Sequence, residues 1–205
     1  QSPPAAAQAW LDGHARILGA SLDLRLSRTV ELGERRGTLF VFAQFIDAIA
    51  VDRGHVAIVV DNGTPNRVVY ASARVVDPST AAFQPDTMTA VSALDSVKRL
   101  PDYAGYSKWS APELVVLDPK RMPTIATPLR AWKFGGGQPA GAESEGRTFF
   151  VNAADGALVA SRGNACQLGV AGVVKGWAVP SGELGPDDGS PVLTEQVLED
   201  VCVTS

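Results

Sequence analysis

Residues 38–60 read TLFVFAQFIDAIAVDRGHVAIVV, and this stretch decides the class of the fold. Its first part alternates in two sets of side chains, Leu39, Val41, Ala43 and Phe45 against Phe40, Phe42 and Gln44. That period of two predicts a β-strand, and the β-branched run at 56–60 predicts a second one. The polar residues 61–66 have hairpin-loop chemistry and lead into a third β-branched run at 68–76. The stretch therefore predicts an antiparallel meander.

A helix is predicted before this meander, with a short strand at 24–30 between them. Residues 5–18 are rich in alanine, and Gly19 follows where a helix would stop. Four residues at near-helical spacing predict its apolar face: Trp10, His14, Ile17 and Leu18. We expect His14 to lie at a core or its edge rather than to bind a ligand. A helix followed by a meander is an α+β unit.

The same plan is predicted a second time after a linker at 78–85, which has a proline at each end. Asp86 and Thr87 can cap a helix that runs to about residue 99, and an apolar face is predicted from its spacing: Met88, Val91, Leu94 and Val97. Four strands follow, at 114–117, 129–134, 148–151 and 157–160. Between them we expect an exposed glycine-rich loop at 135–146 and a tight turn at 152–156.

The last part of the chain has a different sequence pattern. Residues 170–180 read VAGVVKGWAVP, a predicted strand with regularly spaced glycines, and residues 201–203 begin another. Two strands cannot bury a core alone, so this segment either packs on the second unit or opens an incomplete domain. The predicted organisation is α+β throughout, with two helix-plus-antiparallel-sheet units at 1–78 and 79–163 and a β segment at 164–205.

Composition and charge exclude several classes of function. The chain has 205 residues, 20% of them charged, with a formal net charge of −4 and no block of lysine and arginine. Nucleic-acid binding is therefore not predicted. The longest apolar stretch, 38–51, is interrupted by Gln44 and Asp47 and is too short to span a membrane. The opening QSPPA is typical of a mature N-terminus left after a leader is removed, although a trimmed sequence would begin in the same way. We therefore expect a secreted or cell-surface protein.

The two cysteines suggest a disulfide, and no cofactor is predicted. Cys166 and Cys202 form an even pair, which favours a bridge in an exported protein, although two buried thiols are the alternative. Together with His14 and His55 they are too few and too scattered for a zinc site. Asp187 and Asp188 beside a glycine are typical of extracellular calcium loops, but a turn that caps its own backbone is favoured.

The sequence contains no catalytic constellation. It has neither the His-Glu-x-x-His of a metalloprotease helix nor the Gly-x-Ser-x-Gly of a hydrolase elbow. The glycine run at 135–137 lacks the Lys-Ser/Thr ending of a phosphate loop, so a flexible hairpin tip is predicted there. These absences predict a protein that is not an enzyme.

Residues 42–51, FAQFIDAIAV, resemble the motif of the fungalysin/thermolysin propeptide (FTP) domain. The matching residues are Phe42, Gln44, Ile49 and Val51. In that family an aromatic-x-Gln strand leads into a Gly-Ile-Pro-Val turn, whereas this chain has Ala48 and Ala50 in place of the glycine and the proline.

The second unit resembles a PepSY domain, the usual companion of that propeptide. The resemblance lies in LRAWK at 129–133, which contains Trp132, and in FVNAADGALV at 150–159, which contains Asp155 and Gly156. Residues 170–176 loosely resemble the first strand of a β-sandwich domain of secreted precursors.

The resemblance implies the non-catalytic propeptide region of a secreted thermolysin- or fungalysin-type metalloprotease, which acts as intramolecular chaperone and inhibitor. Its implied partner is the catalytic or another downstream domain of the same precursor. Residues after 162 do not resemble the start of such a catalytic domain. The alternative is therefore a secreted protein-binding or assembly module that reuses the propeptide fold.

Overall fold

A computed structural model of the chain describes residues 2–19, 21–32, 37–137, 146–163, 174–178 and 194–198. The chain divides into two units, Gln1–Arg162 and Gly163–Ser205, which are treated separately below. The division predicted from sequence, 1–78, 79–163 and 164–205, stays a prediction. Among the described residues, no helix is long and apolar enough to cross a membrane.

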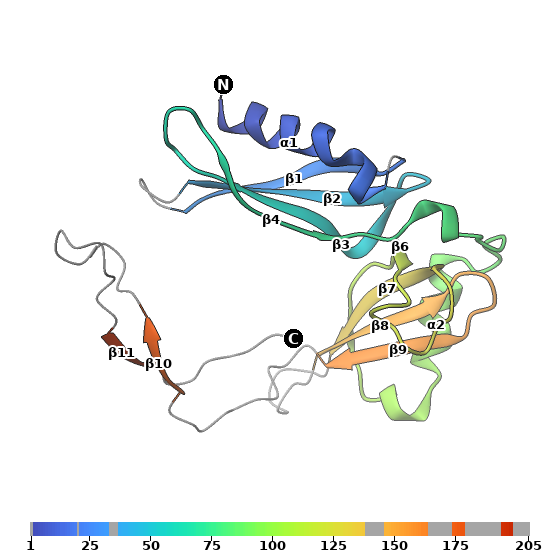
Figure 1. Cartoon of the computed structure of the whole chain (residues 1–205). Coiled ribbons are helices and arrows are strands. Elements are labelled where there is room, and N and C mark those ends of the chain that lie inside the picture. Colours follow the sequence, from blue (N-terminus) through green and yellow to red (C-terminus); the bar gives the residue numbers. More distant parts are fainter. Residues whose placement is uncertain are drawn as a thin grey trace. The chain divides into compact units, whose positions relative to one another are not determined.

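In the described part of the first unit, nine strands form one mixed sheet in the order β1-β2-β3-β6-β7-β8-β9, with β4 paired to β3 and β5 paired to β7 (Figure 1). The strands are β1 (Asp23–Glu31), β2 (Thr38–Ile46), β3 (Ile49–Val60), β4 (Val68–Arg74), β5 (Lys108–Trp109), β6 (Glu113–Leu117), β7 (Leu129–Gly137), β8 (Arg147–Asn152) and β9 (Leu158–Gly163). The helices are α1 (Pro3–Leu18) and α2 (Ala90–Lys98), with 3-10 turns at Pro78–Thr80 and Pro101–Tyr103. The α+β class predicted from the sequence is confirmed.

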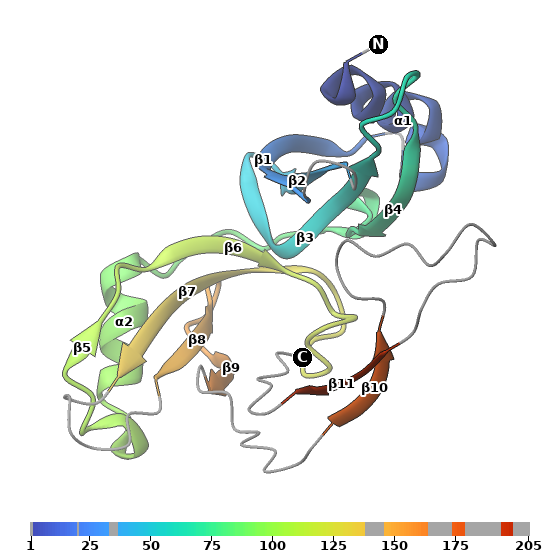
Figure 2. The ribbon, with the colours of Figure 1, turned by 90° about the vertical axis from the view of Figure 1, so that its left-hand side faces the viewer.

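Helix α1 lies on one face of the first meander (Figures 1 and 2). It has a proline in its first turn and ends at Gly19, whose φ of 110° favours glycine. Ala6, Ala7 and Leu11 are buried against a core that β2 and β3 supply, Phe40, Phe42, Val56, Ile58 and Val60. The prediction that Ile17 lies on the apolar face is wrong, because Ile17 is 83% exposed. The helix turns about 100° per residue, and the neighbouring Leu18 takes the position against the core.

A two-residue turn at Asp47 and Ala48 joins β2 to β3, and both residues have positive φ, 50° and 63°. Such a turn matches the twist of the flanking strands. Beyond it, Phe45 pairs with Ala50 while Ala43 pairs with His55, so residues 51–54 of β3 bulge away from β2. A side chain at Gly54 would lie 2.7 Å from Val51 Cβ, so the bulge needs glycine there.

At the bulge β3 has a third partner, after β2 and β4. Val51 pairs in parallel with Val116 of β6, the link that joins the first meander to the second. Around it lies a small core of Ile46, Val51, Val76 and Val116. The remaining pairings of the second meander, β6 with β7 and β7 with β8, are antiparallel.

Helix α2 begins at Ala90 with Thr89 as its N-cap, later than the cap predicted at Asp86 and Thr87. The cause is tertiary. The Thr87 and Met88 amides both donate to the Ala153 carbonyl, and the Thr87 hydroxyl donates to the Ala154 carbonyl, which holds this segment out of the helix.

The predicted apolar face of this helix is also partly wrong. Val91 is 67% exposed, and the residues buried from α2 are Ala93 and Val97. Met88 lies outside the helix and packs over Gly156, whose φ is 78°.

The prediction of a glycine-rich hairpin tip at Gly135–Gly137 is wrong, because these residues belong to β7. Gly136 is buried, and a Cβ there would lie 2.7 Å from the Trp109 ring and 2.9 Å from Phe149. The glycine is needed for close packing in the core of Phe134, Phe149 and Val151. Residues 138–145 of the predicted loop lie outside the described residues.

The second unit is described only in the antiparallel pair β10 (Val174–Ala178) and β11 (Thr194–Leu198). Strand β10 lies within the run predicted at 170–180, and β11 was not predicted. Residues 201–203, Asp187, Asp188 and the cysteine pair Cys166 and Cys202 lie outside the described residues, so the disulfide stays a prediction.

Replacing Ala48 by glycine is expected to stabilise the fold by about 0.5–1 kcal/mol. The reason is that glycine removes the cost of a left-handed alanine, about 1–2 kcal/mol, at a smaller cost in backbone entropy. Urea unfolding measures the change. Ala57→Gly, in the middle of β3, is the matched control and should destabilise. Loss of stability in Ala48→Gly would contradict this account of the turn.

Candidate functional site

The face of β1–β4 opposite α1 carries aliphatic side chains that belong to none of the core clusters of the described residues. Strand register places Val30, Leu39, Val59 and Tyr70 in one row across the four strands. Val41 and Ala57 lie in the next row. We call these six residues the open face. Val30, Leu39, Val41, Ala57 and Val59 are only half-buried, and Tyr70 is 57% exposed.

The open face is unusual because β2 is apolar on both sides. The side toward α1 is fully buried at alternate positions from Thr38 to Ile46. The other side is half-exposed in the described part of the chain, although it carries Leu39 and Val41. A contiguous exposed apolar patch on a soluble domain marks an interaction surface.

Basic side chains border the open face. Arg28 lies opposite Val41, and Arg74 lies opposite His55. Neither arginine forms an ion pair with any described residue. A third arginine, Arg25, stacks 4.2 Å from the Phe45 ring centre and is paired with Asp23 at 2.6 Å; its hydrogen bond lowers the pKa of the Asp23 carboxyl.

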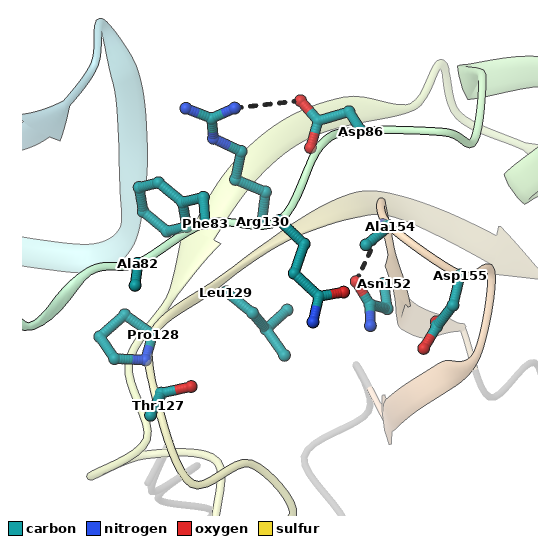
Figure 3. Close-up of a pocket in the computed structure, with 11 residues that line it drawn as sticks. Ala82, Phe83, Asp86, Thr127, Pro128, Leu129, Arg130, Asn152, Ala154 and Asp155 are labelled. Carbon is teal, nitrogen blue, oxygen red and sulfur yellow. Dashed lines mark hydrogen bonds and ion pairs between the residues drawn. The ribbon is translucent and has the colours of Figure 1, made fainter.

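A second candidate site is a polar pocket of about 190 Å³ (Figure 3). Residues 82–86 of the linker, residues 127–130 at the start of β7 and the β8–β9 turn line it. Arg130 dominates its charge. The guanidinium lies 2.8 Å from Asp47 and 3.3 Å from Asp86, and it stacks 4.6 Å from the centre of the Phe83 ring.

Several polar groups of this pocket already have partners within the chain, whereas Arg130 Nε is buried without a hydrogen-bond partner among the described residues. Asn152 Oδ1 accepts the Ala154 amide at 3.0 Å, and Asp155 Oδ1 accepts the Ala157 amide at 2.9 Å. Arg130 ties the β2–β3 turn to the linker through its two aspartates. The arrangement positions chain segments, and the pocket offers no nucleophile paired with a base.

Three residues of the first family motif, Gln44, Ile49 and Val51, lie around the bulge. Phe42 is in the core under α1, while Ile49 and Val51 pack around the β3–β6 link. Gln44 is fully buried and bonds the backbone of Val76 twice: its Nε2 donates to the carbonyl at 2.5 Å, and its Oε1 accepts the amide at 2.8 Å. Gln44 thereby fixes the chain as it leaves β4.

The residues of the second motif meet at Met88. Trp132 Nε1 donates to the Met88 carbonyl at 2.9 Å, and Gly156 packs beneath the Met88 side chain. Asp155 closes the β8–β9 turn. The structure keeps the two motif groups at different places in the sheet, and their assignment to family motifs stays a prediction.

The histidines take part in local structure. His14 Nδ1 lies 2.8 Å from the Trp10 carbonyl oxygen, and its ring stacks on Trp10 at 4.1 Å, half-buried at the edge of the core as predicted. His55 Nδ1 lies 2.9 Å from the Arg53 carbonyl oxygen. Within the described ranges, no three His, Cys, Asp or Glu side chains come together to hold a metal ion.

Comparisons with known proteins give little similarity. No family model and no curated protein matches the chain. Among solved structures, the chain is similar to the Bacillus megaterium YpeB C-terminal domain, at 14% sequence identity and a TM-score of 0.40, over 80% of this chain and 65% of that one. The chain thus spans less than two thirds of that domain's length, and the propeptide resemblance stays a prediction.

Gln44→Leu is expected to lower the free energy of unfolding by about 2–4 kcal/mol, since it strands a buried amide and a buried carbonyl at Val76. Chemical denaturation measures it. Gln8→Leu is the control, because Gln8 bonds Asp12 on the exposed side of α1 and should change stability by less than about 0.5 kcal/mol. An equal loss of stability in the two variants would show that the hydrogen bonds of Gln44 to the Val76 backbone do not stabilise the fold.

Proposed function

We propose that the protein is a non-catalytic protein-binding module that packs its open face against a globular partner. The open face carries this proposal: it presents Leu39, Val41 and Val59 from the centre of a sheet, half-exposed, with arginines at its border. Covering half-exposed aliphatic surface contributes about 25 cal/mol for each Å² removed from water, against the entropy cost of association. A rigid sheet also presents that surface without a large ordering cost.

The partner that the sequence resemblance favours is the catalytic or another downstream domain of a secreted thermolysin- or fungalysin-type metalloprotease precursor. In this role the chain is the propeptide region, FTP-like and then PepSY-like, and acts as intramolecular chaperone and inhibitor. A preformed sheet shortens the search of a slowly folding partner for its non-local contacts. While both remain in one chain, the high effective concentration keeps the partner covered.

A secreted binding or assembly module is the second candidate. The observation in its favour is the antiparallel pair β10–β11 in the part of the chain where a catalytic domain would begin. Such a module would use the same open face on a different partner.

The test is a titration of the purified chain against its cognate thermolysin-like protease, with peptide cleavage as the readout. We expect saturable inhibition. Tyr70→Asp places a charge on the open face and should weaken inhibition at least tenfold, about 1.4 kcal/mol. Ile17→Asp is the matched control, because Ile17 is 83% exposed on α1 and should leave inhibition unchanged.

Absence of inhibition at high micromolar concentration would exclude the propeptide role and leave the binding or assembly module. Equal inhibition by the chain and by Tyr70→Asp would instead exclude the open face as the contact surface.

A further inference from the structure

Strand β4 forms an edge of the sheet. In the described part of the first unit it pairs with β3 along one side and has no strand partner along the other (Figure 2). No residue of β4 is buried, and Val69 and Tyr70 are 60% and 57% exposed. An edge strand turns the backbone N–H and C=O groups of alternate residues outward, where a second extended chain can bond them.

The opposite edge of the first meander is protected against such pairing. Strand β1 has a register shift between Leu26 and Arg28 and four charged residues, Asp23, Arg25, Arg28 and Glu31. Charged side chains and bulges keep an edge strand from pairing with another chain. Strand β4 reads VVYASAR, and its one charged residue, Arg74, stands at its end. The edge of β4 is therefore open to a partner strand.

Residues 70–74 are the regular part of β4. The register shift of this strand lies before them, and from Tyr70 to Arg74 each residue pairs with one residue of β3. Side chains alternate along a strand, so Tyr70, Ser72 and Arg74 lie on the side of the open face. Ala71 and Ala73 lie on the side of α1, where Ala71 packs on the core.

These five residues are complementary to a second copy of themselves. In an antiparallel pairing about a two-fold axis at Ser72, Ser72 lies opposite the partner's Ser72, and Tyr70 lies opposite the partner's Arg74. Arg74 is exposed and forms no ion pair with a described residue, so its guanidinium can stack on a tyrosine ring. An axis at Arg74 would instead set two like charges opposite each other.

We propose that the protein forms a dimer in which β4 pairs antiparallel with β4 of a second copy, about a two-fold axis at Ser72. Such an interface uses the same residues of both copies, as in other two-fold dimers. It bonds the outward backbone groups of both edges, which is how a strand adds to a sheet. It also makes the open faces of the two copies continuous, because residues opposite each other point to the same side of a sheet. The pairing involves no other protein and does not rest on the propeptide role.

Analytical ultracentrifugation of the full chain at increasing concentration tests the dimer. We expect an equilibrium between monomer and dimer at micromolar concentration. Ser72→Lys places two ammonium groups opposite each other at the axis and should raise the dissociation constant about tenfold or more. Thr29→Lys is the matched control, because Thr29 is exposed on the other edge strand, β1, and should change the dissociation constant by less than about twofold. Circular dichroism confirms that each variant is folded.

An exchange of charges tests the register. Tyr70→Lys sets a lysine opposite the partner's Arg74 and should weaken the dimer about tenfold. Adding Arg74→Glu to Tyr70→Lys sets opposite charges against each other and should restore most of the affinity. Within one copy the two residues lie four positions apart along β4, roughly 13 Å, which is too far for a direct ion pair. Rescue therefore reports contact between two copies.

Three outcomes would overturn the proposal: a chain that stays monomeric at high micromolar concentration, self-association that Ser72→Lys leaves unchanged, or no rescue of Tyr70→Lys by Arg74→Glu. Protease inhibition separates the dimer from the proposed function. A chain that dimerises as described but inhibits no protease would support the dimer and exclude the propeptide role.

Discussion

One strand, β3, pairs with strands of both meanders, and the rest of the first unit depends on this double pairing. Along one side, β3 pairs with β2. Along the other, its residues 55–60 pair with β4 and Val51 pairs with Val116 of β6. Pairing with β2 is interrupted at residues 51–54 and resumes at Ala50. This bulge, with Gly54 at its tightest contact and Arg53 in a left-handed conformation, lies where the partner on the other side changes from β4 to β6.

The region around the bulge is also held by polar contacts between residues that lie far apart in the sequence. Gln44 holds the backbone at Val76, Arg130 joins Asp47 to Asp86, and Lys133 reaches Asp52. Gln44 satisfies buried backbone groups that would otherwise be left without partners, a loss that costs about 1–3 kcal/mol for each group. The Arg130 pairs are partly exposed and contribute mainly to geometry, since such pairs are worth about 1 kcal/mol or less. Asp52 is buried, so its pair with Lys133 offsets the cost of removing a carboxylate from water. Together they fix the chain around the β2–β3 turn and the bulge.

Local pattern predicted the local structure well. The alternation in residues 38–46, the polar loop at 61–66 and the turn at 152–156 each carry their signal in adjacent residues, and each has the predicted form. The errors have non-local causes. Helix α2 starts late because Thr87 and Met88 bond the β8–β9 turn, and Gly136 lies in a strand because Trp109 and Phe149 leave no room for a side chain.

Of the candidate sites, too, one could be predicted from adjacent residues and the other could not. The open face has a signal in the sequence, since β2 is apolar on both sides. The ion pairs of Asp52 have none, because Lys133 and Arg162 lie far from it in the sequence and meet it only in the folded sheet. The FTP and PepSY resemblance and the disulfide stay predictions, and so does the propeptide role.

The central claim is that β3 makes one cooperative sheet of both meanders, and native-state hydrogen exchange of the full chain in rising urea tests it most directly. The amides of β2 and β7 should lose protection with the same free energy of opening and the same dependence on urea, because unfolding of either meander removes the β3–β6 pair and the ion pairs that join the two. If the amides of β7 exchange through a separate, less stable opening while those of β2 remain protected, the two meanders are independent and the account is wrong.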